Sequence, residues 1–114
     1  MKNERFIKKV ADKANVSYSI NTNGSCGYCI DFEYWSDLGE DCIIELVVDD
    51  LTKKEIIKVM ENEYENFDYQ QHAVDCYNMG GQNGTPTDLE ALLTDAKKQD
   101  EKMKEILDIM KELA

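Results

Sequence analysis

The chain has 114 residues, of which 24 are Asp or Glu and 13 are Lys or Arg, so its formal net charge is -11. The length suits one domain spanning residues 1–114, and an apolar fraction of 42% is too high for a disordered acidic tail. The negative charge argues against direct binding to nucleic-acid phosphates or to anionic membranes, because both require a basic surface.

The N-terminal half predicts one helix followed by three strands. A helix is expected over residues 3–15, where apolar residues recur at helical spacing and Asn3 can cap the start. Asn23 and Gly24 predict a hairpin turn after the first strand. The strands are expected over residues 16–20, 26–35 and 42–48.

The C-terminal half predicts two helices with a fourth strand between them. Thr52 and Glu55 form a capping-box pattern at the start of the first helix. Residues 72–79 are interpreted as the fourth strand, and residues 80–86 as a loop. The order α-β-β-β-α-β-α predicts an α+β domain with a mainly antiparallel four-stranded sheet packed by helices, in which residues 16–79 supply the sheet and one helix.

The last helix, expected over residues 87–113, is long for so small a domain. It opens with a capping box of Thr87 and Glu90, and the residues that follow repeat in a heptad pattern. Such a pattern favours pairing with a second helix, so a homodimer through this helix is one interpretation. The expected oligomerisation residues are Leu92, Ala96, Gln99, Met103, Ile106 and Met110.

Acidic residues concentrate in the middle of the chain, since residues 21–50 contain eight Asp or Glu and no Lys or Arg. Trp35 shares a predicted strand face with Asp31 and Glu33. An exposed Trp surrounded by carboxylates would be a contact anchor for a partner, and burial of Trp35 under a helix is the other interpretation. The expected partner-binding residues are Asp31, Glu33, Trp35, Asp37, Glu40, Asp41, Asp49 and Asp50.

No residue pattern indicates an enzyme. His72 is the only histidine, and nothing gathers a nucleophile, a base and an orienting acid, so a structural bond to Asp68 or to a turn carbonyl is expected. Cys26 and Cys29 have the spacing of a redox or zinc pair, but side chains three apart in a strand point to opposite faces. We expect no cofactor and no metal, the alternative being a site made by Cys26, Cys29, Cys42 and Cys76.

The first 15 residues mix charged and apolar side chains without a run typical of a signal peptide. No stretch approaches 18 consecutive apolar residues, so no membrane association is expected. These features predict a cytoplasmic protein, in which cysteines are most simply free thiols.

Three segments carry a resemblance to known proteins. They are Trp35–Asp41, Tyr64–Asp68 followed by His72, and Gly84–Pro86 leading into Leu89, Leu92, Leu93, Asp95 and Ala96. Together, over about residues 35–110, they resemble a group of small acidic proteins carried by phages and mobile elements of Gram-positive bacteria. The resemblance implies a bacterial cytoplasm as the setting, and no catalytic residues, because the group has no assigned activity.

Two functions are compatible with these observations. In the first, the protein binds a basic surface of another protein through its acidic segment, as a nucleic-acid mimic that blocks a DNA- or RNA-binding surface would, in the manner of anti-restriction or anti-CRISPR proteins. In the second, the chain is a non-enzymatic dimeric adaptor or scaffold assembled through its C-terminal helix, and the acidic surface serves only solubility.

Overall fold

The computed structural model describes residues 3–22, 24, 27–79 and 88–114. Within these ranges the chain forms helices and one antiparallel sheet, with a long helix at the C-terminus, which confirms the α+β class. The elements, in chain order, are α1 (Glu4–Ala14), β1 (Ser17–Thr22), β2 (Tyr28–Trp35), β3 (Asp41–Val48), α2 (Lys53–Asn66), α3 (Tyr69–Met79) and α4 (Leu89–Leu113).

The sheet has the strand order β1-β2-β3, so that β2 is central and β1 and β3 are its edges. Phe32 of β2 lies opposite Tyr18 of β1 and Ile44 of β3. Every second residue of β3 from Cys42 to Val48 is buried, and the residues between them are exposed. This alternation shows that helices cover one side of the sheet only.

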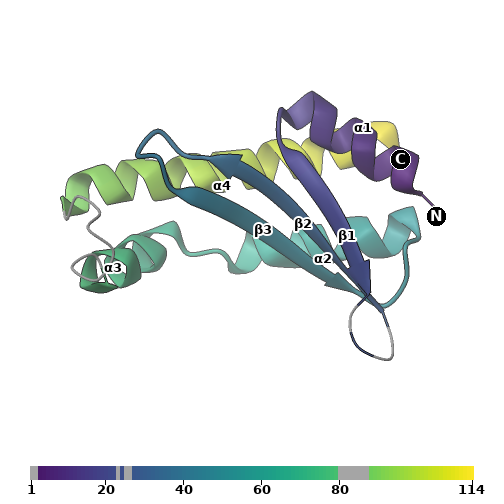
Figure 1. Ribbon diagram of the computed structural model, residues 1–114, viewed down its shortest axis with the longest axis horizontal. Coiled ribbons are helices and arrows are strands. Elements are labelled where there is room, and N and C mark those ends of the chain that lie inside the picture. The colour runs from purple at the N-terminus through teal and green to yellow at the C-terminus, as the bar shows by residue number, and fades with distance from the viewer. Residues whose placement is uncertain (1–2, 23, 25–26, 80–87) are drawn as a thin grey trace.

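Helices α1, α2 and α4 cover that side, and α4 runs the length of the molecule behind the strands (Figure 1). Their apolar side chains meet those of the sheet in one hydrophobic core. Each fully buried large apolar side chain contributes about 1.5–3 kcal/mol to folding. The largest are Ile7, Val10, Ile30, Phe32, Leu46, Val48, Ile56, Met60, Ile106 and Met110.

The predicted fourth strand over residues 72–79 is wrong, because this segment belongs to helix α3. The Asp68 side chain accepts hydrogen bonds from the backbone N–H groups of Gln70 and Gln71, at 3.1 and 3.2 Å, as an N-cap residue does. Tyr69, Ala73 and Cys76 then recur at helical spacing and pack against α4. The sheet therefore has three strands instead of four, and α3 lies beside the first half of α4, beyond the sheet (Figure 1).

The capping box predicted at the start of α2 is half correct. The Thr52 hydroxyl accepts a hydrogen bond from the backbone N–H of Glu55 at 3.3 Å. The Glu55 carboxylate accepts from the N–H of Asp49 at 3.2 Å, and the N–H of Thr52 is bound by the Asp50 carboxylate at 2.9 Å. The reciprocal bond of the box is thus replaced by two bonds that fix the turn between β3 and α2.

Helix α4 is capped by Asp88, whose side chain accepts from the N–H of Glu90 at 3.1 Å. Of the helices that the structure describes, none has both the length and the apolarity needed to cross a membrane. Several features singled out in the sequence lie outside the described residues: the predicted cap Thr87, the loop 80–86, Asn23 of the turn and Cys26 of the cysteine pair.

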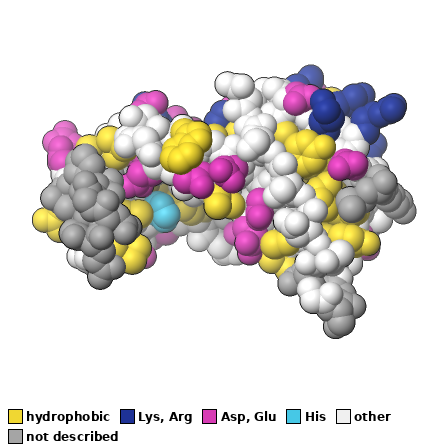
Figure 2. Space-filling view, viewed as in Figure 1, with side chains coloured by type: hydrophobic (Ala, Val, Ile, Leu, Met, Phe, Trp, Pro, Cys, Tyr) yellow, Lys and Arg dark blue, Asp and Glu magenta, His cyan; other side chains and the backbone are white. Residues whose placement is uncertain are grey.

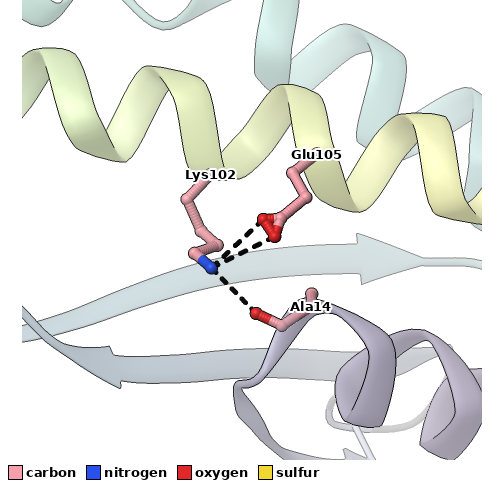
Figure 3. Close-up of polar contacts among 3 residues, drawn as sticks. All are labelled: Ala14, Lys102 and Glu105. Carbon is pink, nitrogen blue, oxygen red and sulfur yellow. Dashed lines mark hydrogen bonds and ion pairs between the residues drawn. The ribbon is translucent and has the colours of Figure 1, made fainter.

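Hydrogen bonds with distant segments fix both ends of α1. At its C-terminus, Lys102 donates a hydrogen bond from Nζ to the carbonyl oxygen of Ala14 at 2.8 Å and lies 3.3 Å from both carboxylate oxygens of Glu105 (Figure 3). The last carbonyls of a helix lack intrahelical donors and carry partial negative charge, which an ammonium group satisfies. At the N-terminus, the Asn3 side chain does not cap the helix but donates to the carbonyl oxygen of Leu51 at 2.6 Å.

Candidate functional site

The side of the sheet that no helix covers is the candidate site, and we call it the open face. Figure 2 shows hydrophobic and acidic side chains next to one another over the sheet, while Lys and Arg side chains gather over α1. The residues whose side chains alternate away from the core are Ser17, Ser19, Asn21, Cys29, Asp31, Glu33, Trp35, Asp41, Ile43, Glu45 and Val47.

The open face combines apolar and negatively charged groups. Trp35 is 69% exposed, and Ile43 and Val47 are each 50% exposed. The three strands contain no Lys or Arg, and all of their acidic residues lie on the open face. The exposed Trp35 agrees with the interpretation of this residue as a contact anchor and excludes its burial under a helix.

Asp31 and Glu45 are directly opposite one another on β2 and β3. The Oδ1 atom of Asp31 is buried and has no hydrogen-bond partner among the described residues. Burial and, next, the nearby Glu45 carboxylate raise the pKa of Asp31. Burial also raises the pKa of the Cys29 thiol, with further contributions from Glu45 and Asp31. The centre of the open face therefore holds negative charge that the fold itself leaves uncompensated.

A second acidic pair lies toward one end of the open face. A hydrogen bond with Asp41, followed by the charge of that residue, raises the pKa of Glu33. Asp41 is also the cross-strand neighbour of Trp35. Two neighbouring carboxyl groups beside an exposed indole form an acceptor-rich surface with a large apolar contact at its edge.

The structure gathers three of the seven acidic residues predicted as a binding segment. Asp31, Glu33 and Asp41 share the open face with Trp35, whereas Asp37 and Glu40 lie in the turn between β2 and β3, where Asp37 forms an ion pair with Lys98. Asp49 and Asp50 follow the far end of β3, about 25 Å from Asp41 at ~3.3 Å per residue. Those two are separated from the rest, and their role in the turn before α2 is structural.

Sequence reasoning missed Glu45, Ile43 and Val47 as members of this surface. The signal was present, because these residues alternate with the buried Ile44 and Leu46. The sequence predicts a strand over residues 42–48, but the prediction does not assign its two faces. Its alternation, once paired with that of β2, would have put Glu45 beside Asp31.

The three cysteines that the structure describes are not brought together as the alternative metal site requires. Cys29 lies on the open face, Cys42 is buried on the core side, and Cys76 is on α3. Burial raises the pKa of Cys42 to about 11, which makes it an unreactive thiol. Within the described ranges, the donor atoms that do converge belong to Cys29, Asp31 and Glu45, which lie within 4.8 Å of one another.

His72 is part of the packing between α2 and α3. Its ring lies 5.3 Å from the ring of Phe67, and its Nε2 atom is 3.7 Å from the sulfur of Cys76. The N–H of His72 donates to the Asp68 carbonyl oxygen at 2.9 Å, but this is a backbone bond of helix α3 and not a bond of the His72 side chain. This arrangement gives His72 a structural position.

The heptad stripe of α4 forms the core of the same chain, which corrects its assignment as an oligomerisation seam. Met103 and Ile106 pack in the main core with Met110, while Leu92 and Ala96 pack against α3. Gln99, between the two clusters, is half-buried. An a and d pattern specifies a helix face that must be buried, and here the sheet and α3 bury it.

Comparisons with protein-family models, with curated proteins and with solved structures find no match to this chain.

Proposed function

We propose that the protein acts by binding another protein, whose surface presents basic residues around an apolar patch, through the open face. The observation that carries this proposal is the uncovered side of the sheet, where Trp35, Ile43 and Val47 are exposed among carboxylates that have no cationic neighbour on the strands. Exposed aromatic anchors bordered by charge are typical of protein interfaces.

The electrostatic argument supports a basic partner. Burial and, next, the Glu45 carboxylate raise the pKa of Asp31, while a hydrogen bond with Asp41 and, next, the charge of that residue raise the pKa of Glu33, so each carboxyl group is repelled by another acidic group. A Lys or Arg of a partner would replace this repulsion with attraction. The long-range field of a chain with a net charge of -11 would also accelerate association with a basic protein.

The partner that fits best is a protein whose basic surface ordinarily binds DNA or RNA. Carboxylates on alternate residues of adjacent strands form a two-dimensional array of negative charge, which can occupy cationic sites that otherwise hold phosphates. The sequence resemblance to proteins of phages and mobile elements supports this choice, because such elements benefit from blocking restriction or CRISPR nucleases. The apolar residues of the open face would add affinity that phosphates cannot supply.

The experiment compares capture of proteins from a Gram-positive bacterial lysate by three forms of the full chain. They are the wild type, an open-face variant (Asp31→Asn, Glu33→Gln, Glu45→Gln) and a matched variant that removes three exposed acids elsewhere (Glu65→Gln, Glu101→Gln, Asp108→Asn). Both variants change the net charge equally. We expect a protein that the wild type and the matched variant retain, that the open-face variant loses, and that duplex DNA displaces.

Equal retention of every captured protein by the two variants would overturn the proposal. Retention that depends on the open face but resists duplex DNA and RNA would overturn the nucleic-acid-mimic form alone. The alternative of a dimeric scaffold assembled through α4 is not supported, because the stripe it would use is buried in the chain's own core.

A further inference from the structure

Among the described residues, strand β3 is an edge of the sheet with no strand on its outer side. Its backbone is hydrogen-bonded to β2, and no other described group bonds to the backbone of residues 41–48. In an antiparallel edge strand, alternate residues direct both their N–H and their C=O away from the sheet. About four residues of β3 therefore present unpaired backbone groups along its outer edge.

The two edges of the sheet differ in length and polarity. Neither edge strand contains Lys, Pro or Gly. Edge strands usually carry such residues to prevent pairing with another chain. β1 has six residues, four of them Ser, Asn or Thr, whereas β3 has eight residues with the longer and more apolar sequence DCIIELVV. The edge of β3 is thus the better template for strand addition.

A groove of about 310 Å³ runs along this edge. Its floor contains Ile44 and Met103, which are buried. Residues from both faces of β3 line it, which places the groove at the edge of the strand and not above its face. The residues lining it are Ile43, Ile44, Glu45, Val47, Glu63, Phe67, His72, Gln99 and Met103.

The chemistry of the groove defines the segment that would fill it. Glu45 lies on the β3 side of the groove and Glu63 on the α2 side, and none of the described residues that line it is Lys or Arg. Side chains of an added strand alternate between the two faces of the sheet. Those on the core side would meet Ile44, Met103 and the Phe67 ring, and those on the open side would lie next to Glu45.

We propose that β3 binds an extended segment of a partner protein, in which apolar residues alternate with Lys or Arg, by strand addition along this groove. The proposal rests on the proposed function, since it names the way in which the basic partner is held. Main-chain hydrogen bonds to β3 supply affinity, and the alternating apolar and acidic groups supply specificity.

A second copy of the chain fits the groove less well. Antiparallel pairing of two β3 strands would bring together two proteins that each carry a net charge of -11. It would also add a second Glu45 next to the first, beside the existing Asp31, instead of a cation. Like charges on neighbouring strands are destabilising, so the groove selects a basic segment.

The test uses the full chain and an eight-residue peptide of alternating Val and Lys, with two further peptides N-methylated either at the Val or at the Lys amides. In an added strand only one of these two sets of amides faces β3, so each methylated peptide is the control for the other. We expect one of them to bind at least ~10-fold more weakly than the parent and the other to bind within ~3-fold. The amides of β3 should gain protection from hydrogen exchange when the parent peptide binds.

A pair of variants tests the groove itself. Glu63→Lys places a positive charge in the groove, where it repels the Lys residues of the peptide. Glu65→Lys makes the same charge change at an exposed position of α2 that does not line the groove. We expect Glu63→Lys to weaken peptide binding ~5-fold or more and Glu65→Lys to change it less than ~2-fold. Folding of both variants is checked by their unfolding midpoints.

Equal binding of both methylated peptides would overturn strand addition. So would self-association at tens of micromolar that protects the β3 amides without peptide, because a second copy would then fill the groove. In either case loss of partner capture by the open-face variant, but not by the matched variant, would still support the proposed function. Conversely, the peptide could protect the β3 amides from hydrogen exchange while the open-face variant captures partners as well as the wild type does. That result would overturn the proposed function and leave strand addition supported.

Discussion

Asp31 of β2 lies directly opposite Glu45 of β3 on the open face, and in the part of the chain that the structure describes neither carboxylate forms an ion pair. Like charges opposite one another on neighbouring strands reduce the stability of a sheet. A residue pair that works against folding is a sign that the surface is adapted to something other than folding, and under the proposed function this is a cation of the partner.

Asp31→Asn should stabilise the protein at neutral pH. The pKa of Asp31 is raised in the folded state by burial and by Glu45, so the ionised carboxylate disfavours folding above that pKa. Below the unfolded-state pKa both states hold the proton and the penalty disappears. We expect a gain of about 1 kcal/mol in the free energy of unfolding near pH 7, and almost none near pH 3.

Urea unfolding of wild type and Asp31→Asn at the two pH values measures this gain. Asp108→Asn, an exposed carboxyl on α4, is the control and should change stability by less than ~0.5 kcal/mol at either pH. A loss of stability in Asp31→Asn near pH 7 would show that the Asp31 carboxylate supports the fold.

Trp35→Ala should leave stability nearly unchanged and impair binding. The side chain is 69% exposed in the free protein, so its removal costs folding less than about 0.5 kcal/mol. As an interface anchor its loss should weaken binding of the captured partner by about 10-fold or more. Thermal unfolding and a binding titration on the same preparation separate the two effects, and a large drop in the unfolding midpoint would contradict the account.

Lys102→Met should destabilise the contact between α4 and α1. The variant keeps most of the aliphatic stem, which is packed at a site 23% exposed, but removes the donor to the Ala14 carbonyl oxygen. We expect a loss of about 1–2 kcal/mol in the free energy of unfolding. Lys104→Met, on the exposed side of the same helix, should cost less than ~0.5 kcal/mol, and equal losses in both would contradict the bonding role of Lys102.

Ile106→Ala should show that the heptad stripe belongs to the core of a single chain. Ile106 is completely buried within the chain, so removing most of its side chain should cost about 2–5 kcal/mol. The unfolding midpoint should not depend on protein concentration in the wild type or in the variant. A concentration-dependent midpoint that the substitution abolishes would instead support a dimer formed through α4.

The sequence alone predicts an element correctly where its apolar residues follow one regular spacing. In β2 the alternation of Ile30 and Phe32 with Asp31 and Glu33 predicts both the strand and its two faces. α3 was missed because Val74 and Cys76 were interpreted at a spacing of two residues. The hydrogen-bonding capacity of Asp68 before the segment was the better signal, since a side chain that caps two N–H groups starts a helix.

Two features could not be obtained from one sequence. The apolar stripe of α4 looks the same whether a second helix or the chain's own sheet covers it, because both require the same buried positions. The acidic segment likewise appears continuous from Asp31 to Asp50, but β3 separates Asp49 and Asp50 from Asp41 by about 25 Å at ~3.3 Å per residue. Only the pairing of β2 with β3 shows that Glu45 belongs with Asp31 and that Asp50 does not.

The most direct test of the account is the affinity of the captured partner for the wild type, the open-face variant and the matched variant, measured by titration calorimetry at about 50 and 300 mM salt. The account predicts that the matched variant binds within ~2-fold of the wild type, and that the open-face variant binds at least ~10-fold more weakly at low salt and loses most of the salt dependence. Equal affinities and equal salt dependence of the two variants would contradict the claim that the open face is the binding surface.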